Sequence, residues 1–240
     1  MQESKRIVTK SRQITLAAVF SAVYFVLRAI PTFQMVGTSG YFTTADFLLT
    51  TIALVAGLWS GSLAVFIGTV AAYAWGGPPI FFGLDFLPAL ANVAIAGFLL
   101  SGRRGTAIGA YIAVLVAFLI SPYSLLFGYY GIPYVWLHLL ALGVLLSPIS
   151  SRIPTWIRRL DYRCVVAIVA LAFIGTMAQH LVGGLLYEFS VGFVGGVTPQ
   201  HMMDSWRVIF WLYPEERVIL VIISTLIAVG VYRSFEKWSR

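Results

Sequence analysis

The chain has 240 residues, of which 60% are hydrophobic and only 10% are charged. Soluble domains carry about 25% charged residues, so this composition excludes a soluble catalytic or nucleic-acid-binding domain and predicts an integral membrane protein. The net charge of +7 is therefore interpreted as a sign of orientation in the membrane, not of binding to nucleic acid. The single cysteine, Cys164, excludes an internal disulfide.

The N-terminal region predicts a basic cytoplasmic arm over residues 1–13 and a first membrane span over about 14–34. A cleavable signal peptide also begins with basic residues and an apolar run. Here Arg28, Pro31 and Phe33 follow the run in place of a small-residue cleavage site. We therefore expect the span to be retained.

An almost continuously apolar stretch runs from Thr44 to Gly102, interrupted by Gly and Pro at 57–61 and 76–79. Backbone polar groups cannot be hydrated inside a bilayer, so each piece must be helical. The stretch predicts spans over about 44–58, 60–75 and 84–101.

The second half predicts four further spans, separated by Ser-Pro, basic and Gly-rich segments. They cover about 106–121, 133–149, 164–188 and 215–232, with a basic surface segment at 150–163, a loop at 189–205 and a short interfacial helix at 206–213. Spans 106–121 and 133–149 are short, and if both were re-entrant, six spans would remain.

The predicted fold is an all-α, polytopic helical bundle of about eight transmembrane helices, with six as the alternative. Residues 14–233 form one bundle, divided into 14–104, an extra hairpin at 106–149 and C-terminal spans at 164–233, followed by a tail at 234–240. Thirteen of the 16 Lys and Arg residues fall at 1–13, 103–104, 150–163 and 233–240. Because basic residues favour the cytoplasmic side, both termini are predicted to be cytoplasmic in a multi-pass cell-membrane protein.

The ionisable groups within the spans all fall in the predicted outer halves, which indicates a polar cavity open to the outside. The candidate ligand-binding residues are Arg28, Asp85, Asn92, His138, Gln179, His180 and Glu188. Structural alternatives stay open: Arg28 could reach the headgroups or pair with a carboxylate, Asp85 could cap a helix, and Asn92 could join two helices. Two buried histidines could also ligate haem, although a satisfied buried histidine is commoner.

Four features together resemble the substrate-binding S component of energy-coupling-factor (ECF) vitamin transporters. They are the A-x-x-x-A spacing of Ala18 and Ala22, Thr44-Ala45-Asp46, the tight turn at 57–61 and the Gly/Pro-rich loop at 76–88. The resemblance implies uptake of a vitamin or other small micronutrient, captured in an outward-facing cavity without catalysis or cofactor. It also implies partners: a transmembrane coupling subunit docked at Ala18 and Ala22, and two ATPase subunits. The chain has no G-x-x-x-x-G-K-[ST] phosphate loop, as expected if ATP hydrolysis belongs to the partner subunits.

A second resemblance is to eight-span membrane sensor domains of the MASE1 type, which share a glycine-tryptophan turn and an asparagine like Asn92. The sensor or structural interpretation keeps the same cavity but needs no energy-coupling partner. An enzyme is the least favoured class, because no nucleophile-base or metal-ligand spacing is visible.

Overall fold

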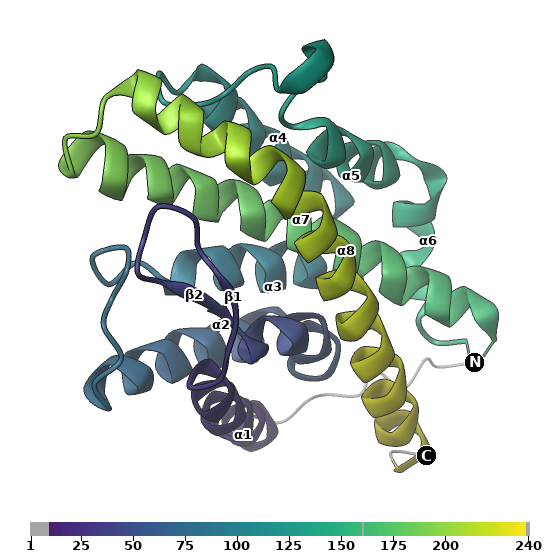
Figure 1. The fold of residues 1–240 in the computed structure, drawn as a ribbon. Coiled ribbons are helices and arrows are strands. Elements are labelled where there is room, and N and C mark those ends of the chain that lie inside the picture. Colours follow the sequence, from purple (N-terminus) through teal and green to yellow (C-terminus); the bar gives the residue numbers. More distant parts are fainter. Residues whose placement is uncertain (1–9, 160, 239–240) are drawn as a thin grey trace.

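A computed structural model describes residues 10–159 and 161–238, and these are almost entirely helical (Figure 1). The predicted all-α class is confirmed, with one small β-hairpin as the exception. Residues 1–9 of the expected arm and 239–240 of the expected tail lie outside the described residues.

The first helix is shorter at its C-terminal end than predicted. Helix α1 spans Lys10–Arg28, and strands β1 (Pro31–Gln34) and β2 (Tyr41–Thr43) follow. The predicted helix to residue 34 is therefore wrong, because Pro31 disfavours helical backbone in the residue before it and here begins a strand. The strands pair antiparallel, and a 3₁₀-helix, η1 (Thr44–Leu48), leads into the next long helix.

Helix α2 (Leu49–Ala74) is broken at Gly57, whose φ of 75° lies in the left-handed region. A methyl group added at Gly61 would lie 3.0 Å from Cγ2 of Ile52. Residues nine apart in a straight helix are separated by about 13.5 Å, so the chain bends back sharply here. The turn expected at 57–61 is present, and Gly57 permits it because glycine adopts positive φ without strain.

Three further helices and a short 3₁₀ turn form the middle of the chain. Helix α3 spans Phe86–Leu100, α4 spans Arg104–Ile120, η2 spans Tyr129–Gly131 and α5 spans Trp136–Leu146. Part of the basic segment expected on the membrane surface belongs to helix α6 (Pro148–Trp156), which meets α5 at 63°. The Ser147 hydroxyl caps α6 by accepting the Ile149 N–H, and Pro148 occupies the first turn, where proline is tolerated.

The last third consists of two long helices. Helix α7 (Tyr162–Tyr187) continues into a π-helix, η3 (Glu188–Val194), and α8 then runs unbroken from Pro199 to Trp238. The prediction of a loop to 205, a separate interfacial helix and a span beginning after Pro214 is therefore wrong. Pro214 lies inside α8.

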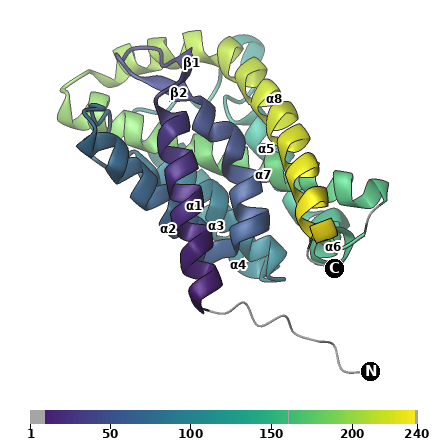
Figure 2. The ribbon, with the colours of Figure 1, turned by 90° about the horizontal axis from the view of Figure 1, so that it is seen from below.

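Helix α7 lies at the centre and packs against α3, α4, α5, α6 and α8. Figure 2 shows α1 alongside α2 at one flank and α8 descending along the other side. Glycines bring helices close together: a methyl group at Gly68 would lie 2.9 Å from the Ser21 carbonyl oxygen, and one at Gly97 would lie 2.9 Å from Cβ of Leu58. Small residues favour such packing where lipid provides no hydrophobic drive for helix association.

Three helical segments of the described chain are long and apolar enough to cross a membrane: Thr44–Ala74, Tyr162–Val194 and Pro199–Ser234. The bent pair α5 and α6 makes a fourth candidate if it counts as one span. Helices α3 and α4 are apolar but shorter. These lengths indicate association with a membrane.

Candidate ligand-binding site

The candidate site is a cavity where the C-terminal end of α1, the β-hairpin and η1 face α7, α8 and the loop before α3. It offers about 110 Å³ to the centres of water molecules. One water needs about 10–15 Å³ on that measure, so the space suits several waters or a small molecule. Its polar lining includes Arg28, Asp46, Asp85, Gln179, His180, Glu216 and Arg217.

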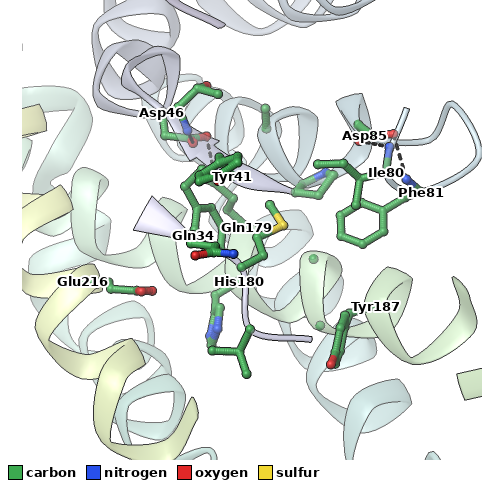
Figure 3. A pocket seen from close by; sticks show the side chains of 18 of the residues that line it. Gln34, Tyr41, Asp46, Ile80, Phe81, Asp85, Gln179, His180, Tyr187 and Glu216 are labelled. Atoms are coloured by element: carbon green, nitrogen blue, oxygen red, sulfur yellow. Dashed lines mark hydrogen bonds between the residues drawn. The ribbon is translucent and has the colours of Figure 1, made fainter. Parts of the chain in front are cut away.

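A chain of hydrogen bonds joins three elements behind one wall of this cavity. Asn92 on α3 donates from Nδ2 to Oε1 of Gln179 at 3.0 Å, and Gln179 on α7 donates from Nε2 to Oδ1 of Asp46 at 2.7 Å. Oδ2 of Asp46 accepts the Thr43 N–H at 3.1 Å. The chain fixes the side chain of Asp46 at the cavity wall (Figure 3). Asn92 is itself buried beneath Gln179 and does not line the cavity.

Two arginines border the cavity, Arg28 on α1 and Arg217 on α8. Arg28 ends α1 and is half-buried, with no carboxylate oxygen within 4 Å among the described residues. Arg217 on α8 is 1% exposed, and its guanidinium carbon lies 4.3 Å from the centre of the Phe42 ring in the hairpin. Nη2 of Arg217 donates to Oε2 of Glu216 at 3.0 Å.

The carboxylate of Asp85 binds backbone N–H groups of the loop before α3. Its Oδ1 accepts the Ile80 N–H at 2.9 Å and its Oδ2 accepts the Phe81 N–H at 3.1 Å (Figure 3). Asp85 is the N-cap residue of α3, but its side chain makes no hydrogen bond to the helix, so the expected helix cap is not formed. The carboxylate instead holds the preceding loop, and the residue also borders the cavity.

The two predicted histidines form a pair. Nε2 of His138 lies 2.9 Å from Nδ1 of His180, and the Tyr213 ring stacks on both imidazoles with centroid distances of 5.6 and 5.0 Å. Only His180 lines the cavity, and His138 lies behind it. An iron between two imidazole nitrogens needs about 2 Å on each side, so this direct bond leaves no room for axial haem ligation.

Glu188 lies away from the cavity lining, contrary to the sequence prediction. It is buried at the start of η3, where its Oε1 accepts the Ser124 hydroxyl at 2.7 Å. The reason is angular: His180, Gly184 and Tyr187 share the face of α7 that borders the cavity. The residue after Tyr187 points about 100° further round the helix.

Comparison with protein-family models, with curated proteins and with solved structures found no match. The site therefore rests on its own geometry. Of the seven predicted binding residues, Arg28, Asp85, Gln179 and His180 border the cavity, and Asn92 and His138 support it from behind.

Sequence reasoning missed Asp46, Glu216 and Arg217 as cavity residues. In the sequence, Asp46 lies at the outer end of a predicted span. Glu215 and Glu216 lie at the start of the last predicted span, where acidic residues suit the positive end of a helix dipole. The usable signal was the cost of placing Arg217 next to a long apolar run, since an intramembrane cation needs a partner or a cavity.

The predicted docking residues Ala18 and Ala22 lie on the outward face of α1 and are exposed, together with Ile14 and Val26. The inward face carries Ala17, Ser21 and Tyr24, all buried. This face of α1 is therefore exposed in the described part of the chain and is accessible to lipid or to another protein.

Proposed function

We propose that this protein captures a small molecule in the membrane, as the substrate-binding subunit of an ATP-driven uptake transporter for a micronutrient. The observation that carries the proposal is the cavity, in which charged and amide side chains from α1, η1, α7 and α8 converge on a mostly apolar space. A concave, largely apolar site with a few convergent polar groups is the usual form of a small-molecule site.

The distribution of elements between the two ends of the helical bundle supports an eight-span topology with both termini in the cytoplasm. The cavity collects the C-terminal end of α1 and the start of α3. At the other end of the bundle, Arg12, the Gly57 turn and Arg103 surround a separate groove. Arg12 and Arg103 thus lie away from the cavity, which is the expected distribution if the cavity opens outward. The sharp bend at Gly57 supports two short passes within Thr44–Ala74.

The exposed small-residue face of α1 supports docking on a transmembrane coupling subunit, which would work with two ATPase subunits. Ala18 and Ala22 lie one turn apart and present little side chain, so another helix could approach closely.

Two measurements test the proposal. Native mass spectrometry of the protein purified in mild detergent should detect a retained small molecule, and co-purification should recover a coupling subunit with two ATPases. A retained ligand without such partners would favour the sensor interpretation. Absence of any bound or bindable small molecule would refute capture in this cavity.

A further inference from the structure

We infer that the cavity selects ligands bearing an anionic group, a carboxylate or a phosphate, which binds to the guanidinium of Arg217. This inference rests on the proposed capture function and adds the chemical class of the ligand. It assigns the main charge recognition to α8, not to Arg28, which was the cation singled out by the sequence.

The first step is the count of donors on Arg217. Nε and Nη1, which carry three of the five N–H bonds of a guanidinium, have no acceptor within the described chain. Nη2 alone is engaged, by Oε2 of Glu216. A buried charged group with unmet donors is costly, so this arrangement is expected where a ligand supplies the acceptors.

The second step is that neighbouring acceptors are already used or out of reach. No oxygen of Asp46 lies within 4 Å of the Arg217 nitrogens, and both oxygens of Asp46 accept hydrogen bonds from Gln179 and the Thr43 N–H. Phe42 covers one face of the guanidinium, which holds its plane without satisfying its edges. Arg217 therefore borders the cavity and is held in position, with buried donors that no described residue accepts.

The third step concerns the fit of an anion. Planar guanidinium groups match carboxylate and phosphate oxygens, and such charge-assisted bonds are stronger than neutral ones. The adjacent Glu216 opposes an anion, and its side chain is 18% exposed. The two residues should thus affect anion binding in opposite directions. The apolar wall, which includes Ile80, Phe81 and Leu212, would contact the uncharged part of the ligand.

The test uses matched probes on the full chain in nanodiscs: benzoate and phenylphosphonate as anions, and benzamide as a neutral molecule of similar shape. Binding is measured by thermal shift and by isothermal titration. We expect the wild type to bind at least one anion more tightly than benzamide. Arg217→Gln should weaken anion binding by roughly 10- to 100-fold, the effect of one lost charged hydrogen bond, and leave benzamide binding unchanged.

Three further variants keep the test informative. Arg217→Lys retains the positive charge, so it can be tested if Arg217→Gln does not fold. It should bind anions with an affinity between those of the wild type and Arg217→Gln. Glu216→Gln should strengthen anion binding. Arg207→Gln is the control, because Arg207 is an exposed arginine on the same helix, paired with Asp204. It should leave binding unchanged.

The outcomes separate this inference from the proposed function. If benzamide binds as tightly as the anions, or if both Arg217 variants keep the preference for anions, the anion inference is overturned while capture in the cavity stands. If none of the three probes binds the wild type at millimolar concentration and no molecule is retained on purification, both are overturned.

Discussion

Gln179 on α7 donates a 2.7 Å hydrogen bond to Asp46, a residue 133 positions earlier in the chain. The same amide accepts from Asn92 on α3, so one side chain joins three elements beside the cavity. An amide is suited to this position because it donates and accepts at once, and a carboxylate there could not donate to Asp46.

The first prediction is that Gln179→Leu destabilises the empty protein by about 1–3 kcal/mol, because Asn92 and Asp46 both lose a buried partner. Denaturant titration in mild detergent measures the free energy of unfolding. Gln200→Leu is the matched control, since Gln200 is exposed at the start of α8, and its effect should stay within about 0.5 kcal/mol. Equal effects of the two changes would contradict a structural role for the hydrogen bonds that join Asn92, Gln179 and Asp46.

The second prediction concerns the contact between α1 and α2. Gly68→Ala should cost about 1–3 kcal/mol, because the added methyl group would lie 2.9 Å from the Ser21 carbonyl oxygen and from Cδ1 of Tyr24. Gly109→Ala on α4 meets nothing within 4 Å and should be neutral or stabilise by up to about 1 kcal/mol. The same unfolding titration compares them. If Gly68→Ala left the free energy of unfolding unchanged, α1 could move away from α2 without loss of stability.

The third prediction tests the outward face of α1. Ala18→Trp and Ala22→Trp should leave folding and ligand binding nearly intact but block assembly with the coupling subunit, as measured by co-purification and transport. Ala17→Trp is the contrasting variant, because Ala17 is 3% exposed and the larger side chain should destabilise the fold. Survival of transport in both exposed-face variants would rule out docking at this face.

The fourth prediction is that Arg28→Ala lowers the stability of the empty protein by less than about 1 kcal/mol, because no carboxylate lies within 4 Å to be left uncompensated. A fully buried ion pair would instead cost about 3–5 kcal/mol. Thermal stability is measured with and without the retained molecule. A large loss in the empty state with an unchanged ligand-induced shift would remove Arg28 from the site.

The fifth prediction concerns topology. Cysteines introduced at Phe127 and Val194 should react with an impermeant thiol reagent added from outside, whereas Ser101→Cys and Ser151→Cys should not. All four positions are exposed in the fold, and the native Cys164 is buried, so its own labelling should be low. Outside labelling at 101 would reverse the orientation.

The sequence was sufficient to predict the helices because apolar runs bounded by Gly and Pro must be helical in lipid. The turn at Gly57 could be found because a tight reversal requires positive φ. The β-hairpin could not, since strands of four and three residues are too short to show a recognisable alternating pattern. The continuity of α8 through Pro214 was also hidden, because tertiary packing can compensate a lost helical hydrogen bond.

The site was partly predictable because depth along a span can be counted from the sequence, but direction around a helix depends on which neighbours surround it. Depth placed Gln179, His180 and Glu188 in the outer half of the same span. Packing placed the first two beside the cavity and turned Glu188 toward Ser124. Arg217 was not predicted as a site residue, because its place at the start of a predicted span does not show that packing buries it beside the cavity.

The proline within α8 has a mechanical consequence for the cavity. Because Pro214 has no N–H, the carbonyl four residues earlier, on Phe210, lacks its usual partner in the helix. Trp206 and Leu212 border the cavity on one side of this point, and Arg217 borders it on the other. The missing hydrogen bond therefore weakens α8 between the residues that border the cavity before Pro214 and Arg217, which borders it after Pro214. A small change of bend there would alter the width of the cavity while the other helices stay in register.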